Sequence, residues 1–142
     1  MALTVLNFRF CFPPLLRLLA GMIDNDQKLA DFLPMLRAAD WVALDTEADS
    51  LHAYPEKLCL LQISLPRTDI LVDPLATMDL APLLGALQER ELILHGADYD
   101  LRLLRRNCGF VPYAVFDTML AARLLGETEF GQIGRASCRE RV

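Results

Sequence analysis

Two carboxylates one residue apart, Asp45 and Glu47, follow directly on an apolar run that begins at Trp41. In a β-strand the side chains alternate between faces, so Asp45 and Glu47 point the same way and Thr46 points the other way. Two anions on one face beside a buried strand repel each other and lose hydration unless a positive charge lies between them. The pair therefore predicts a buried strand that carries an acidic site, with a divalent cation as its partner.

The apolar spacing elsewhere alternates between strand and helix patterns. The helix over residues 24–39 has apolar residues at i, i+3, i+4 and i+7, with Asp24 or Asp26 as its N-terminal cap, and Pro34 should kink or divide it. The later predicted helices are 80–90, 98–107 and 116–125, and the predicted strands are 41–47, 58–65, 69–73 and 91–95. A turn-like segment between the second and third strands favours antiparallel pairing, while a strand reached through a helix is usually parallel to a neighbour. The predicted fold class is therefore α/β, with a mixed sheet and helices.

The composition is that of one soluble domain. Of the 142 residues, 54% are hydrophobic and 23% are charged, and no apolar run reaches the roughly eighteen residues of a membrane span. The cysteines are too far apart for a zinc or redox motif. They are Cys11, Cys59, Cys108 and Cys138. We expect buried free thiols in a cytoplasmic protein without a membrane partner.

Both ends of the sequence look foreign to this domain. Residues 1–21 hold an apolar stretch that Pro13 and Pro14 interrupt, and no signal-peptide cleavage site follows, so an over-extended start with Met22 as the natural first residue is favoured over a signal peptide. Residues 133–142 resemble the translation of a sequencing adapter, and Gln132 fits a codon across the join. The expected organisation is an extension over 1–21, one domain over 22–131 and an artefact tail over 132–142.

The charge of the central region is strongly acidic. The whole chain has a net charge of −5, but residues 22–132 hold 9 of the 14 basic residues and 18 of the 19 acidic ones, which gives −9. Such a domain binds nucleic acid poorly by charge alone. Clustered carboxylates do suit divalent cations that bridge to phosphates, so the charge disfavours a non-specific binding module more than a metal-dependent enzyme.

A second polar group follows the predicted strand 91–95. Gly96 allows a tight turn, Asp98 is placed to cap the next helix, and Asp100 falls in its first turn, where the helix dipole favours an anion. From there Asp100 could reach the acidic pair on the first strand. The alternative is that both aspartates are only cap and first-turn residues, and that His95 is a core histidine rather than a catalyst.

Three segments together resemble the ribonuclease D-type 3′–5′ exonucleases of the DEDD superfamily. The segment LDTEADSLHAYPEKLCLLQIS, residues 44–64, is similar to their first motif. The segment LHGADYDLRLL, residues 94–104, resembles the second, in which the acidic ligand lies five residues after the histidine, here Asp100. The segment FDTMLAARLLG, residues 116–126, resembles the stretch that follows in the same family. Three linked segments are far more specific than one D-x-E motif.

The resemblance implies a ribonuclease H-like fold and removal of nucleotides from the 3′ end of RNA with two divalent metal ions, Mg²⁺ or Mn²⁺. It implies that Asp45 bridges both metals, that Glu47 binds the metal carrying the attacking water, and that Asp100 serves the second metal. RNA 3′ ends are the implied substrate, with transfer RNA precursors among the candidates. Three further residues match family positions without an assigned step, and these are Tyr54, Gln62 and His95.

The third motif of that family, a Tyr followed four residues later by Asp, lies well after the segment that resembles residues 116–126, and this sequence ends before it. Asp117 matches the intermediate segment instead and is expected to cap a helix. We therefore expect these 142 residues to be inactive or severely impaired, because a lost ligand leaves the nucleophile-side metal under-coordinated and the attacking water unpositioned.

Two other functions compete with the exonuclease. One is a non-catalytic nucleic-acid-binding domain of the same fold, against which the acidic balance and the retained carboxylates argue. The other is an α/β interaction or scaffold domain in which those carboxylates are caps and surface groups. Three arginines on one predicted helix could contact a phosphate backbone, although a solvated helix face is favoured for them. They are Arg102, Arg105 and Arg106.

Overall fold

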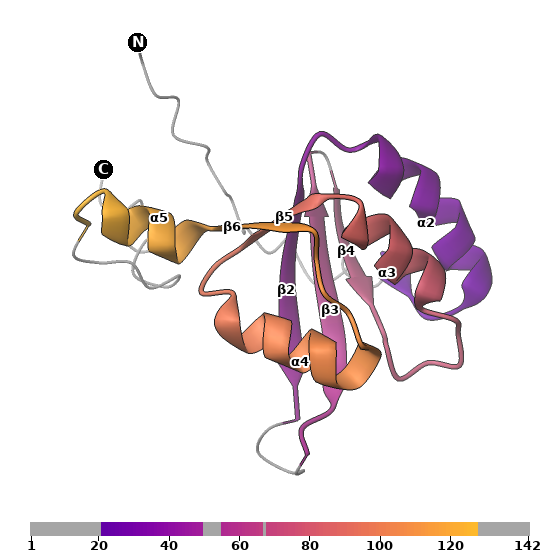
Figure 1. Cartoon of the computed structure of the whole chain (residues 1–142). Coiled ribbons are helices and arrows are strands. Elements are labelled where there is room, and N and C mark those ends of the chain that lie inside the picture. The colour runs from indigo at the N-terminus through magenta and orange to yellow at the C-terminus, as the bar shows by residue number, and fades with distance from the viewer. Residues whose placement is uncertain (1–20, 50–54, 67, 128–142) are drawn as a thin grey trace, which may run out of the picture.

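Strands and helices are mixed along the chain, with three strands in succession between the first two helices (Figure 1). The computed structural model describes residues 21–49, 55–66 and 68–127. The strands are β1 (Met22–Ile23), β2 (Val42–Ala48), β3 (Leu58–Leu65), β4 (Thr68–Val72), β5 (Glu91–Leu94) and β6 (Ala114–Asp117). The helices are α2 (Asp26–Ala38), α3 (Ala81–Gln88), α4 (Asp98–Cys108) and α5 (Thr118–Leu124). Predictions about residues 1–20, Tyr54 and residues 128–142 lie outside the described residues.

The sheet is mixed, as predicted. Its six strands lie in the order β1-β4-β3-β2-β5-β6. The strand β3 is antiparallel to both β2 and β4, while β5, which is reached through a helix, is parallel to both β2 and β6. The strand β2, which carries the acidic pair, is therefore central, and its carboxyl end lies at the same edge of the sheet as that of β5.

The helix α2 begins one position away from the predicted caps. Asn25 is the N-terminal cap, because its side chain accepts a hydrogen bond from the backbone N–H of Lys28 at 3.0 Å, so the prediction of Asp24 or Asp26 was wrong. Pro34 lies inside the helix, which continues past it to Ala38, so the predicted division at this residue was wrong. Pro34 is exposed, so the carbonyl of Ala30 that loses its helical partner is on the solvent side, where water can satisfy it.

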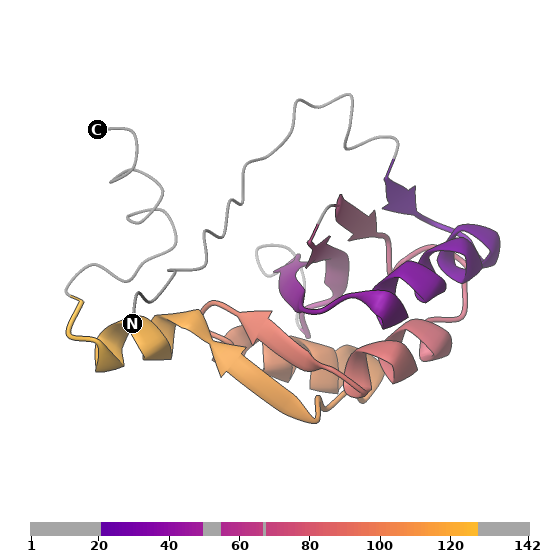
Figure 2. The same cartoon turned by 90° about the horizontal axis from the view of Figure 1, so that it is seen from above.

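The segment predicted as a helix over 116–125 divides into a strand and a helix. Ala114–Asp117 form β6, which pairs in parallel with β5, and α5 begins only at Thr118. Figure 2 shows β6 beside β5 and α5 continuing from its end. Val115 and Phe116 are residue types that favour strands, and Asp117 caps α5, so the helix starts after it. The short strand β1, which pairs with β4, was not predicted because two residues carry no periodicity.

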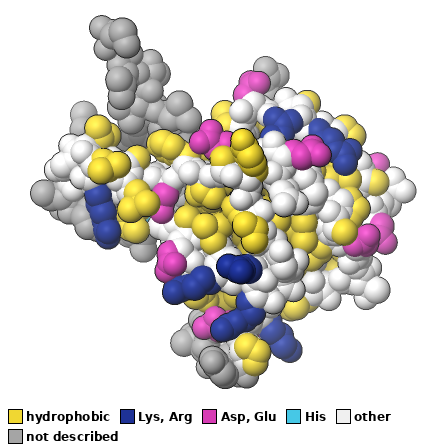
Figure 3. Space-filling view, in the orientation of Figure 1, with side chains coloured by type: hydrophobic (Ala, Val, Ile, Leu, Met, Phe, Trp, Pro, Cys, Tyr) yellow, Lys and Arg dark blue, Asp and Glu magenta, His cyan; other side chains and the backbone are white. Residues whose placement is uncertain are grey.

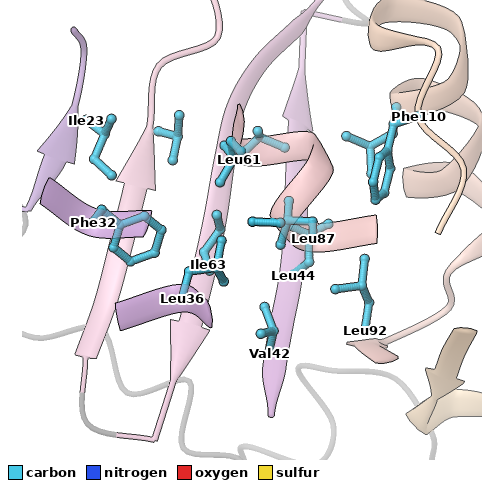
Figure 4. Close-up of a cluster of buried hydrophobic side chains, with 14 of the residues drawn as sticks. Ile23, Phe32, Leu36, Val42, Leu44, Leu61, Ile63, Leu87, Leu92 and Phe110 are labelled. Atoms are coloured by element: carbon cyan, nitrogen blue, oxygen red, sulfur yellow. The ribbon is translucent and has the colours of Figure 1, made fainter. Parts of the chain in front are cut away.

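The core lies between the sheet and the helices. Val42 and Leu44 alternate along β2 with Ala43 between them, and both belong to the hydrophobic core, as do Leu61 and Ile63 of β3. Figure 4 shows these side chains beside those of the helices. The main helical contributors are Phe32 and Leu36 of α2, Leu83 and Leu87 of α3, and Leu103 and Leu104 of α4. The packing of α4 on this core places the start of that helix beside the end of β2.

Candidate metal centre

The acidic pair on β2 has the orientation that strand alternation predicts. Asp45 is half-buried and Glu47 is exposed, while Thr46 between them is only 7% exposed. Asp45 is opposite Gln62 on β3 in the strand register. The side-chain amide of Gln62 donates a hydrogen bond to Glu47 Oε1 at 3.3 Å. Gln62, which matched a family position without a role, thus holds one member of the pair.

Asp100 meets β2 through Thr46. It lies in the first turn of α4 and is 7% exposed. Its Oδ1 accepts a hydrogen bond from the backbone N–H of Thr46 at 3.1 Å and a second one from the Thr46 hydroxyl. The strands β2 and β5 pair only through Val42 and Ala43 of β2, so the Thr46 amide lies beyond the last paired residue and is satisfied by a side chain. The second motif is thereby attached to the first.

The electrostatics of Asp45 and Asp100 disfavour their charged forms. Burial raises the pKa of Asp45, and the charge of Glu47 raises that pKa further. Burial also raises the pKa of Asp100, where the Thr46 hydroxyl opposes the shift and the charge of Asp45 adds to it. The charge of Glu47 therefore repels that of Asp45, and the charge of Asp45 repels that of Asp100. A nearby cation would relieve both repulsions.

The donor chemistry fits a hard divalent cation. Carboxylate oxygens are the ligands that Mg²⁺ and Mn²⁺ prefer, and Thr46 uses Oδ1 of Asp100, which leaves Oδ2 for another ligand. Among the residues that the structure describes, no group of three or more His, Cys, Asp or Glu is placed to hold a metal ion by itself. The site thus suits a divalent cation because its ligands are carboxylate oxygens and because these carboxylates repel one another.

The caps of the last two helices differ from one another. Asp98 does not cap α4, because the N-terminal cap is Ala97 without a side-chain hydrogen bond, and Asp98 pairs instead with Arg102 at 2.9 Å. Asp117 does cap α5, as predicted, since its side chain accepts from the backbone N–H groups of Met119 and Leu120. The same carboxylate also accepts from two residues before α4, which was not predicted.

The histidine of the second motif has one partner and one unpaired nitrogen. His95 Nδ1 lies 2.8 Å from Thr118 Oγ1. In the described part of the chain, His95 Nε2 is the buried side-chain polar atom without a hydrogen-bond partner. The charge of His95 acts to lower the pKa of Asp45, less strongly than burial raises it, which places the ring in the same electrostatic environment as the acidic pair.

Basic side chains gather over α4, as Figure 3 shows. Arg102 pairs with Asp98, and Arg106 lies 3.7 Å from Glu56, while Arg105 is exposed. Exposed pairs of this kind contribute little to stability. The arrangement agrees with a solvated helix face.

Other predictions concern thiols and membranes. The two cysteines within the described residues, Cys59 and Cys108, are free but half-buried rather than buried, so that part of the prediction was wrong. Their neighbours leave each side chain partly open to solvent. No helix in the described ranges is both long and apolar enough to cross a membrane.

Two polar residues of this region were missed by sequence reasoning. Thr46 was treated only as the residue that faces away from the acidic pair, and Thr118 was not singled out. Strand alternation did carry a signal for Thr46, since a polar residue on the buried face needs a partner. No local pattern marks Thr118.

Comparison with known proteins gives consistent relatives. A family model described as 3′–5′ exonuclease matches residues 21–132. Ribonuclease D of Zymomonas mobilis is 36% identical over 124 residues, which are 84% of this chain and 31% of that protein. The crystal structure of Escherichia coli RNase D, an exoribonuclease involved in structured RNA processing, has a TM-score of 0.75 at 29% identity and covers 85% of this chain and 33% of its own. Brucella melitensis NrnC with bound Mg²⁺ has a TM-score of 0.60 at 27% identity, over 79% of this chain and 55% of its own. The chain thus spans about a third of the length of the ribonuclease D relatives.

Proposed function

Because this chain belongs to the ribonuclease D-like 3′–5′ exonucleases, we propose that it removes nucleotides from the 3′ end of RNA with two divalent metal ions, Mg²⁺ or Mn²⁺. The observation that carries the proposal is the attachment of Asp100 to Thr46, between Asp45 and Glu47. It joins the acidic residues of two distant motifs at one edge of the sheet. An interaction domain has no need for neighbouring carboxylates that repel one another.

Asp45, Glu47 and Asp100 are the residues that would hold the metals. Bound there, divalent cations supply a nucleophilic water and stabilisation of charge at phosphorus. Thr46 keeps Asp100 oriented with one oxygen, and Gln62 holds Glu47 from the neighbouring strand. The residues of this chain therefore pre-arrange the oxygen ligands before a metal binds.

RNA is the proposed substrate class because two relatives are ribonucleases by name. The Escherichia coli relative is an exoribonuclease involved in structured RNA processing, and we extend this class to the present chain, with transfer RNA precursors among the candidates. Turnover by these 142 residues is expected to be slow, since the sequence holds no Tyr-x-x-x-Asp segment after Asp117.

The test combines metal binding with a product assay. Mn²⁺ binding is followed by electron paramagnetic resonance, and 5′-labelled single-stranded RNA is incubated with the 142-residue chain and Mn²⁺. We expect Mn²⁺ binding and at most a faint ladder of products shortened from the 3′ end. Asp45→Ala should abolish both, whereas Asp40→Ala, which removes an exposed carboxylate at the other end of the strand, should change neither.

Two outcomes would contradict the proposal. Mn²⁺ affinity that survives Asp45→Ala unchanged would remove the acidic pair from the metal site. RNA binding that needs no metal, together with no Mn²⁺ binding by the wild type, would favour the non-catalytic binding domain.

A further inference from the structure

The turn that joins β5 to α4, residues 94–97, is held by two consecutive residues of the β6–α5 junction. The hydroxyl of Thr118 donates a hydrogen bond to the carbonyl of Leu94 at 3.0 Å. Asp117 accepts from the backbone N–H of Gly96 at 3.0 Å and from that of Ala97 at 2.9 Å. Leu94 and Asp117 are also partners in the parallel register of β5 and β6. Hydrogen bonds thus connect the end of β5 and the turn after it to the end of β6, immediately before α4.

The Asp117 carboxylate serves the starts of two helices. Oδ1 also accepts from the backbone N–H of Met119 at 2.8 Å and from that of Leu120 at 3.2 Å, in the first turn of α5. At α5 these donors are first-turn N–H groups without helical partners, and at α4 the donors are the two residues that precede the helix, so one anion lies beside two helix starts, where the partial positive charge favours it. A cap of α5 alone would need only the bonds to Met119 and Leu120. The bonds to Gly96 and Ala97 are additional.

The packing of the turn leaves little room for another arrangement. Gly96 has φ +72°, in the region that favours glycine, and a Cβ at this position would lie 3.2 Å from Cε of Met119. The backbone of the turn and the first turn of α5 are therefore in close contact. A shift of α5 would therefore displace the backbone at residue 96, four positions before Asp100.

Thr118 also determines which nitrogen of His95 carries the proton. A threonine hydroxyl has one hydrogen, and that hydrogen goes to the carbonyl of Leu94, so Oγ1 accepts from His95 Nδ1 at 2.8 Å. In the neutral imidazole the other nitrogen, Nε2, then bears the lone pair. This is the buried nitrogen that lacks a partner in the described structure.

We propose that Asp117 and Thr118 are positioning residues of the acidic site. They hold the turn that leads into α4, and so the placement of Asp100, and they present His95 with its proton on Nδ1 and a lone pair on Nε2. This inference rests on the proposed function for the identity of the site. The tautomer of His95 follows from the hydrogen bonds alone.

The first experiment measures that tautomer without metal or substrate. Nitrogen-15 NMR of the full chain, at a pH where imidazole is neutral, distinguishes the two forms, and only two histidines are present. We expect Nδ1–H for His95 in the wild type and in Thr118→Ser, which keeps the hydroxyl. Thr118→Val, which keeps the shape but not the acceptor, should shift the population towards Nε2–H. Nε2–H in the wild type, or no change in Thr118→Val, would overturn the assignment.

The second experiment separates positioning from simple helix capping. Asp117→Asn retains one acceptor oxygen and should weaken Mn²⁺ binding by about ten-fold, the lower end of the cost of losing outer-shell hydrogen bonds. Asn25→Ala removes a cap from α2, far from the site, and is the matched control. Equal Mn²⁺ affinities in Asp117→Asn and the wild type would refute the positioning role. A wild type that binds no Mn²⁺ would refute the proposed function instead, while the NMR experiment still tests the tautomer.

Discussion

Asp100 accepts two hydrogen bonds from Thr46, one from its backbone N–H and one from its hydroxyl, across 54 residues of sequence. Both groups are buried, at 7% exposure each. The backbone N–H of Thr46 lies beyond the last residue of β2 that pairs with β5, and Asp100 gives it a hydrogen-bond acceptor. The contact also orients the Asp100 carboxylate, whose charged form is disfavoured by burial. One threonine thus joins the sheet to the helix that supplies the second acidic residue.

Replacing Thr46 by Val should weaken the contact between β2 and α4. The backbone hydrogen bond stays and the hydroxyl donor is lost, so we expect a loss of about 1 kcal/mol in the free energy of unfolding. Mn²⁺ affinity should fall by about ten-fold, because Asp100 loses an orienting partner. Urea denaturation and metal titration measure the two effects, and Thr46→Ser, which keeps the hydroxyl, should recover the affinity. Unchanged affinity in Thr46→Val would mean that the amide alone orients Asp100.

Asp100→Asn should stabilise the metal-free protein while it impairs metal binding. Burial and the charge of Asp45 both raise the pKa of Asp100, so the neutral amide relieves a cost that the folded state bears near neutral pH. We expect a higher melting temperature in EDTA and a lower Mn²⁺ affinity than in the wild type. The exposed neighbour Asp98, changed to Asn, serves as control and should leave Mn²⁺ affinity unchanged. A lower melting temperature for Asp100→Asn would show that Thr46 needs the charged acceptor.

The stabilising effect of Asp117 should disappear in acid. Burial raises the pKa of Asp117, but four backbone N–H donors together outweigh it and hold the pKa below the ordinary value of 3.8. A carboxyl group whose pKa is lower in the folded state stabilises it fully above the unfolded pKa, and this contribution is lost as the pH falls through the folded pKa. The stability difference between wild type and Asp117→Asn should therefore be constant from pH 7 to about pH 5 and shrink below about pH 4. Urea unfolding at a series of pH values checks this, and a difference that grows in acid would contradict it.

Pro34→Ala should stabilise α2. The substitution restores an N–H for the carbonyl of Ala30 in a helix interior, where proline costs about 3 kcal/mol, offset by up to about 1 kcal/mol from the greater freedom of the unfolded chain. We expect a gain of roughly 1–3 kcal/mol in the free energy of unfolding. The neighbouring Met35 is 50% exposed, and Met35→Ala should change stability by much less. A destabilised Pro34→Ala would indicate that the proline ring packs favourably where it is.

Local patterns predicted most of the elements. The strand over 58–65 and the helix start at residue 98 were predicted at their observed positions, because alternation and helical spacing reflect one buried face of a regular element. The errors fall where local patterns compete. Residues 116 and 117 were predicted as the start of a helix, but pairing with β5 makes them the end of a strand. Asn25 rather than an aspartate caps α2, and three capping residues in a row are not distinguished by type alone.

The sequence by itself determined that an acidic pair ends a buried strand and that a second carboxylate begins a helix, since both follow from spacing within a few residues. Only the tertiary structure decided that Asp100 reaches β2 through Thr46. It also decided that Asp117, predicted as a cap of α5, holds Gly96 and Ala97 from 21 and 20 residues away. The physical reason is that periodicity shows which face of an element is covered, whereas the segment that covers it depends on how the whole chain packs. The acidic residues were therefore visible in the sequence, whereas the hydrogen-bond partners of Thr46 and Thr118 were not.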